Sequence, residues 1–188
     1  MNRFRPEDCR EIGYGFSIEN KVVLLAELAL PSRKHGQLFF CMGGIGAGSG
    51  TRQGDVFLVS LSDGEHCRCS RREVVGILKP ELLPDGAKLQ LSQIRPLGAA
   101  DPDIHTPEYS GYSFLPDGRY ASGVWLCSPE EVKDYVKMQK DYQHRVLICD
   151  RDDFAVLELV EGKLVFPDEQ MLRGLCQEHG ADGGMTMT

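Results

Sequence analysis

The sequence contains no long apolar run. A helix that spans a bilayer needs about 20 predominantly apolar residues, and the longest candidate, from Val22 to Leu30, is interrupted by Glu27. Residues 1–8 carry charge, but no apolar stretch follows them. The sequence therefore predicts neither a membrane span nor a secretory signal, and we expect a cytoplasmic protein with reduced thiols.

Recognisable catalytic motifs are also missing. The chain has no G-x-S-x-G sequence, which would present a serine nucleophile on a sharp turn. Its seven cysteines are scattered, and Cys67 and Cys69 are spaced C-x-C rather than C-x₂₋₄-C, as structural zinc sites usually are. Cys41, Cys127 and Cys149 follow apolar residues, so we favour packing in a core. A Cys–His pair stays open, but we predict no cofactor and no catalytic set.

Glycine is concentrated between Gly43 and Gly50. A phosphate-binding loop also follows an apolar strand, but Ser49 stands where such a loop needs lysine, and no helical pattern follows. We therefore predict a flexible hairpin loop. Gly46 and Gly48 would lie in it as candidate contacts with a partner.

Charge is distributed unevenly. Residues 1–100 contain 13 Lys and Arg against 11 Asp and Glu, whereas residues 101–188 contain 8 against 17. An acidic second half disfavours an extended nucleic-acid surface there and suits docking onto a basic protein. The ordinary interpretation, which we rank first, is a solvated face that keeps the protein soluble.

A cluster of arginines in the first half, Arg68, Arg71 and Arg72, allows weak nucleic-acid binding. A solvated strand end explains the same cluster, and it is the interpretation that we favour.

Two acidic clusters could supply ligands to a divalent cation, and a metal-dependent enzyme is therefore an alternative. They are Asp101, Asp103 and His105, and Asp150, Asp152 and Asp153. Aspartate is also favoured in turns because its side chain bonds to the nearby backbone, and this alone explains both clusters. We assign no metal ligand.

The apolar pattern predicts an α+β fold with mostly antiparallel sheets and two or three helices. The expected strands are 21–30, 37–42, 55–61, 66–70, 73–78, 112–115, 120–126, 144–149, 154–160 and 163–166. The expected helices are 80–95, 129–142 and 167–179. Prolines between residues 96 and 107 predict a boundary. It divides a β-rich half, 1–98, from an acidic α+β half, 99–180, with a disordered tail at 181–188.

The clearest helix start lies at Ser128. Ser128 is a good N-cap, Pro129 occupies the first helical position, and Glu131 lies three residues after the serine. This is the pattern of a capping box.

Aromatic residues are dense between Tyr109 and Trp125. Hairpin strands normally bury one face, so we favour Phe114, Tyr120 and Trp125 as core residues, and interface anchors are the alternative. The candidate partner-binding residues of the whole chain are Tyr109, Tyr112, Asp150, Asp152, Asp153, Gly46 and Gly48.

Two stretches resemble a known group of proteins. VGILKPELLPD, from Val75 to Asp85, lies in the first; FLPDGRY and QHRVLICD, from Phe114 and Gln143 onward, lie in the second. They resemble small standalone proteins of mobile genetic elements in gut bacteria, a set that includes anti-CRISPR proteins. The resemblance implies a non-enzymatic inhibitor that binds a basic Cas nuclease and blocks DNA binding or cleavage. It transfers no residue roles.

Overall fold

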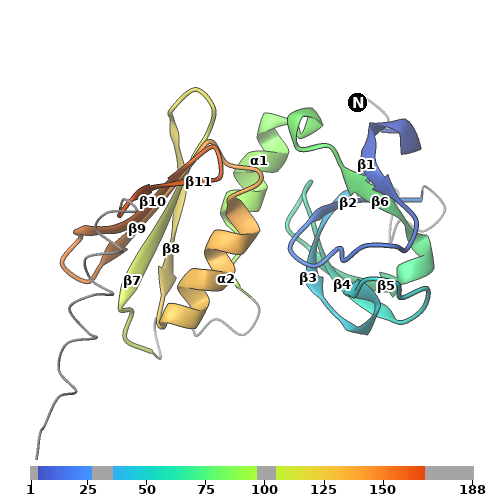
Figure 1. The fold of residues 1–188 in the computed structure, drawn as a ribbon, viewed down its shortest axis with the longest axis horizontal. Helices are drawn as coiled ribbons and strands as arrows, with labels where there is room; N and C mark the ends of the chain where they lie inside the picture. Colours follow the sequence, from blue (N-terminus) through green and yellow to red (C-terminus); the bar gives the residue numbers. More distant parts are fainter. Residues whose placement is uncertain (1–3, 27–35, 97–104, 168–188) are drawn as a thin grey trace, which may run out of the picture.

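The computed structural model describes residues 4–26, 36–96 and 105–167. These residues form two antiparallel sheets with two α-helices between them (Figure 1). The predicted α+β class is therefore confirmed. The two halves contribute one sheet each, and the predicted boundary at 98/99 falls outside the described residues.

The first sheet has six strands in the order β1-β6-β2-β3-β4-β5. They are β1 (Cys9–Ile12), β2 (Val22–Leu25), β3 (Leu38–Gly43), β4 (Asp55–Ser60), β5 (His66–Ser70) and β6 (Val74–Leu78). Only the 3₁₀ helix η4 (Arg71–Glu73) separates β5, at one edge, from β6, near the other edge. Because three residues span little distance, the sheet must curl to bring these strands close.

The second sheet has five strands in the order β11-β10-β9-β7-β8. They are β7 (Tyr109–Phe114), β8 (Tyr120–Leu126), β9 (Arg145–Asp150), β10 (Ala155–Val160) and β11 (Lys163–Phe166). The helices α1 (Asp85–Ser92) and α2 (Pro129–Gln139) lie on its side that faces the first sheet (Figure 1). Short 3₁₀ helices complete the fold: η1 (Pro6–Asp8), η3 (Ile45–Ala47) and η5 (Pro80–Leu82).

The strand β2 is buried on both faces. Val22 and Leu24 belong to the core that continues into the helices and the second sheet, whereas Val23 and Leu25 belong to a second core inside the curl of the first sheet. Burial on both faces explains why this strand reads as an unbroken apolar run rather than an alternating one.

Helix α2 is fixed against the second sheet by Tyr135, which is fully buried. Its hydroxyl lies 2.6 Å from the Ser113 hydroxyl. A Cβ at Gly111 would lie 2.7 Å from the Tyr135 ring, so only glycine allows this close approach. Gln139, also fully buried, donates its amide to the Leu91 carbonyl of α1 at 2.9 Å. It thereby adds a side-chain donor to a carbonyl at the end of α1 that also accepts from the Ile94 amide at 3.1 Å.

Contacts between the halves are polar as well as apolar. Lys21 forms an ion pair with Asp141. The Val22 amide donates to the Tyr142 hydroxyl at 2.6 Å, and burial raises the pKa of Tyr142 above its usual value. One hydrophobic core runs across both halves.

Most expected elements are found, with four differences. Strand β1 was not predicted, and the expected helix 80–95 is divided into the 3₁₀ helix η5 and α1, which begins at Asp85. The capping box is only half formed: the Ser128 hydroxyl accepts from the Glu131 amide at 3.2 Å, but Glu131 accepts from the Cys127 amide. Helix α2 ends at Gln139 rather than near Tyr142. Apart from Pro167, the expected helix 167–179 and the expected tail 181–188 lie outside the described residues.

Candidate interaction surface

The second sheet has one face that neither α1 nor α2 covers. We call four side chains on it the aromatic face: Tyr112, Phe114, Tyr120 and Trp125. Trp125 lies between Val124 and Leu126, which point to the core, so its own side chain points away from the core. Tyr120 is 58% exposed and Trp125 is 54% exposed. The prediction that these two residues pack in the core is therefore wrong.

A β-bulge brings Tyr120 to this face. Strict alternation along β8 would place Tyr120 on the core side with Ser122 and Val124. The register shifts between Ser113 and Phe114, so that Phe114 is opposite Tyr120 although Ser113 is opposite Ser122. The extra residue in β8 reverses the direction of the Tyr120 side chain.

Gly123 provides the space in which the rings meet. It is opposite Tyr112, and a Cβ there would lie 3.0 Å from both the Tyr112 ring and the Tyr120 hydroxyl. The Tyr120 ring centroid is 6.1 Å from that of Tyr112 and 6.1 Å from that of Phe114. These separations are typical of edge-to-face and tilted aromatic pairs.

Charged groups border the rings. The Arg145 guanidinium carbon lies 4.7 Å from the centre of the Phe114 ring. Its Nε is 2.6 Å from a carboxylate oxygen of Glu158. The cation is thus held by a carboxylate and an aromatic face together, which keeps the Phe114 ring in one position.

An acidic turn, which connects β9 with β10, lies beside the aromatic face. The Tyr112 hydroxyl donates to Asp153 Oδ1 at 3.4 Å. Asp150 Oδ1 accepts from the Asp152 and Phe154 amides at 3.0 and 2.9 Å, so it organises the turn, as turn chemistry predicts. Asp152 and Asp153 are exposed, and Phe154 is 70% exposed beside them.

The remaining candidate partner-binding residues lie elsewhere. Tyr109 is half-buried against the core, on the opposite face of β7 from Tyr112. Gly46 is buried in η3, where a Cβ would lie 2.5 Å from the Gly54 carbonyl oxygen. The predicted flexible contact loop is therefore wrong for Gly46, because the segment packs against the strand that follows it. Gly48 is exposed, in the other half of the molecule.

The three arginines do not form one surface. Arg71 is fully buried, and its Nη2 donates to the carbonyls of Gly13 and Phe16 at 2.9 and 3.2 Å. Arg68 pairs with Asp55 at 3.5 Å, and Arg72 is exposed. Because Arg71 cannot reach a ligand in bulk water, the three residues cannot act together as a nucleic-acid site. The favoured interpretation, a solvated strand end, fits the exposed Arg68 and Arg72 but is wrong for Arg71.

The acidic clusters offer little to a metal ion in the described ranges. Asp101 and Asp103 lie outside them, and His105 is exposed. Among residues 4–26, 36–96 and 105–167, no three His, Cys, Asp or Glu side chains lie together in a way that could hold a metal.

Two thiols have the properties of core residues. Burial raises the pKa of Cys41 to about 11 and that of Cys69 to about 12. Both side chains belong to the core inside the curl of the first sheet. Protonated thiols in such surroundings are poor nucleophiles, which supports the packing interpretation for Cys41. Of the other two cysteines expected to pack in a core, Cys149 is buried and Cys127 is only half-buried.

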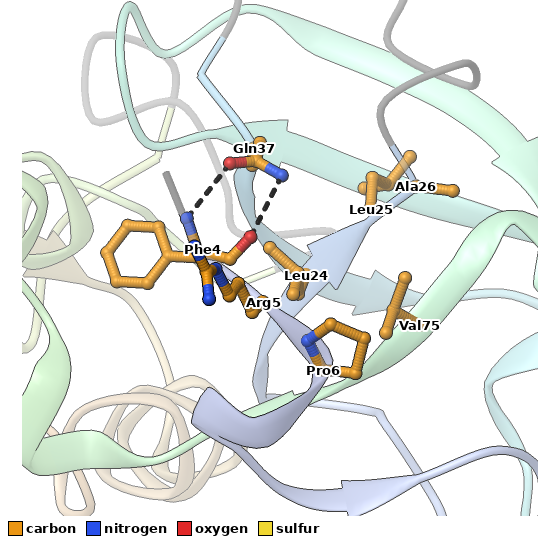
Figure 2. A pocket seen from close by; sticks show the side chains of 8 residues that line it. All are labelled: Phe4, Arg5, Pro6, Leu24, Leu25, Ala26, Gln37 and Val75. Carbon is orange, nitrogen blue, oxygen red and sulfur yellow. Dashed lines mark hydrogen bonds between the residues drawn. The ribbon is translucent and has the colours of Figure 1, made fainter. Parts of the chain in front are cut away.

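An apolar pocket of about 410 Å³ lies at one end of the first sheet (Figure 2). Its described lining residues are Phe4, Arg5, Pro6, Leu24, Leu25, Ala26, Gln37 and Val75. The Gln37 side chain forms two hydrogen bonds with the Phe4 backbone (Figure 2). It accepts from the Phe4 amide at 3.1 Å and donates to the Phe4 carbonyl at 3.4 Å. No carboxylate, imidazole or thiol is among these lining residues, so they supply no acid, base or nucleophile.

Neither a protein-family model, nor a curated protein, nor a solved structure matches this chain. In the part of the chain that the structure describes, no helix is both long and apolar enough to cross a membrane. The function therefore has to be inferred from the surface.

Proposed function

We propose that this chain is a non-enzymatic interaction protein that binds a basic protein partner through the aromatic face and the acidic turn. One observation carries the proposal. The exposed face of a half-covered antiparallel sheet is normally polar, yet here Tyr120 and Trp125 are 58% and 54% exposed. Aromatic side chains gathered on a solvent face are typical of interfaces.

The charge beside the aromatic face favours a basic partner. Asp152 and Asp153 are exposed, and no ion pair to either is found among the described residues. A cationic side chain of a partner could approach these carboxylates and, at the same time, the faces of the Tyr120 and Trp125 rings.

The resemblance to proteins of mobile elements makes a Cas nuclease the first partner to test. A nuclease has to present a basic surface to its nucleic acid. A protein that covers such a surface with aromatic and acidic side chains would block DNA binding or cleavage.

The test is DNA cleavage by a panel of Cas nucleases with the protein in excess. We expect at least one nuclease to be inhibited, and inhibition to weaken as salt rises, because surface charge pairing is screened. Unimpaired cleavage by every nuclease of the panel contradicts the assignment to this partner class.

A charge variant separates the acidic turn from the overall acidity. Asp152→Asn with Asp153→Asn removes two charges beside the aromatic face, and we expect association to slow about fivefold at low salt. Glu7→Gln with Glu81→Gln removes two exposed charges from the first half and serves as the matched control. Equal effects of the two pairs would show that only net charge matters.

A further inference from the structure

The second sheet already holds one arginine against its aromatic face. The Arg145 guanidinium carbon lies 4.7 Å from the centre of the Phe114 ring, and its Nε lies 2.6 Å from a carboxylate oxygen of Glu158. A ring and a carboxylate together suit a guanidinium, because this planar cation can lie on the ring while its N–H groups donate to the carboxylate. Arg145 therefore shows which ligand chemistry such a pair of side chains accepts on this sheet.

A second pair of the same kind lies two residues earlier on β7. The Tyr112 side chain points to the same side as that of Phe114, and its hydroxyl is 3.4 Å from Asp153 Oδ1. Both rings pack against the same neighbour, Tyr120, with centroid separations of 6.1 Å. In the described part of the chain, no cation completes this second pair, since none lies over the Tyr112 ring and none forms an ion pair with Asp153.

The charge around Asp153 is left negative. Asp152 and Asp153 are both exposed. The one cation in the sequence of the turn, Arg151, pairs instead with Glu108 at 3.6 Å. Burial raises the pKa of Cys149, at the end of β9, and the charge of Asp153 raises it further. The negative potential of the turn therefore reaches the sheet, and it favours a cation beside Tyr112.

Trp125 adds a second aromatic surface next to Tyr112. Gly123 is the residue opposite Tyr112 on β8, and Trp125 follows it by two positions, so Tyr112 and Trp125 are diagonal neighbours. Diagonal neighbours on one face of a sheet are about 7–8 Å apart, within reach of aromatic side chains. Trp125 is 54% exposed and Gly123 is exposed as well, so this part of the aromatic face is accessible from solvent.

We propose that an arginine of the basic partner binds between Asp153 and the rings of Tyr112 and Trp125. This inference rests on the docking surface proposed above and names the group that the surface recognises, a guanidinium. The guanidinium lies on the rings and donates to the Asp153 carboxylate, as Arg145 does with its own ring and carboxylate. A lysine fits less well, because its compact ammonium is more strongly hydrated and is not planar.

The fluorescence of Trp125 tests the proposal, because Trp125 is the only tryptophan of the chain. The full chain is titrated at one ionic strength with two peptides of equal charge, hexaarginine and hexalysine. We expect hexaarginine to change the fluorescence and to bind about tenfold more tightly than hexalysine. Equal affinities overturn the guanidinium site but leave the proposed binding of a basic partner standing. Undetectable binding of hexaarginine at about 1 mM overturns the site as well, and the cleavage assay then tests the proposed function separately.

A charge variant locates the binding. Asp153→Asn removes the carboxylate and should weaken hexaarginine binding about fivefold. Asparagine tolerates the positive φ of 65° at this position, so the turn is kept. Glu81→Gln removes one exposed carboxylate from the first half and serves as the matched control, with hexaarginine binding unchanged. If the two variants weaken binding alike, the peptide responds to net charge and the proposed site is wrong.

Discussion

Gly123 leaves the space into which the rings of Tyr112 and Tyr120 turn. Any larger residue would bring its Cβ within 3.0 Å of both side chains and push one of them away from the sheet. The missing side chain thus sets the shape of the aromatic face. A single glycine in an exposed strand therefore has a packing role that composition alone does not reveal.

Arg71 shows the opposite case, a charged residue with a structural role. Its guanidinium carbon lies 5.9 Å from the Tyr14 ring centre and 5.4 Å from that of Phe16. Burial lowers the pKa of Arg71, since it disfavours the charged form. The two carbonyls and the two rings compensate for part of this cost and hold the segment from Gly13 to Phe16 in place.

Arg71→Ala should lower the free energy of unfolding by about 3 kcal/mol, because it leaves a cavity and removes the donors of two carbonyls. Urea denaturation measures the change. The exposed neighbour provides the control: Arg72→Ala should cost less than about 0.5 kcal/mol. Equal costs at the two positions would contradict the structural role of Arg71.

At the scale of elements, α2 connects the second sheet with α1, since Tyr135 packs on the second sheet and Gln139 donates to α1. Its start depends on Ser128, whose hydroxyl accepts from the Glu131 amide. Because the N-terminal amides of a helix lack partners within the helix, this bond satisfies one of them.

Ser128→Ala should reduce stability by about 1 kcal/mol in thermal or urea unfolding, since the cap is lost. Ser128→Asp keeps an oxygen acceptor at the N-cap and should stay close to the wild type. If the alanine and aspartate variants unfold alike, the cap does not stabilise α2.

Sequence patterns predicted the strands and helices well because each follows from local periodicity and turn residues. Ser128 and Pro129 indicated the start of α2. Asp150 indicated the turn between β9 and β10. What failed depends on contacts between distant segments. The β8 bulge reversed Tyr120, and the approach of Gly46 to Gly54 packed a segment that composition predicted to be flexible.

The aromatic face was only partly predictable for the same reason. Val124 and Leu126 alternate toward the core, and this pattern alone indicates that Trp125 points outward. The contact of Tyr112 with Asp153, 41 positions later in the chain, required the pairing of β7 with β9. Tyr109 was assigned to the same surface, but it lies three positions from Tyr112 and therefore on the opposite face of the strand.

At the scale of the whole molecule, the layers determine which surface is free. The helices lie between the two sheets, and one of the two hydrophobic cores continues through them (Figure 1). In the part of the chain that the structure describes, the second sheet consequently keeps one face without a helix, and that face carries the exposed aromatic residues. The exposed Asp152 and Asp153 lie beside this face, which gives a partner both an apolar area and an attractive charge.

The most direct test of this account is the dissociation constant of the partner for a pair of matched aromatic variants. Trp125→Ala should weaken binding by about 2 kcal/mol, roughly thirtyfold in Kd, because interface anchors contribute on this scale. Phe57→Ala removes an aromatic side chain that is 45% exposed on the first sheet, and it should leave Kd unchanged. Equal affinities of Trp125→Ala and the wild type, with the fold intact, would contradict the assignment of the aromatic face as the docking surface.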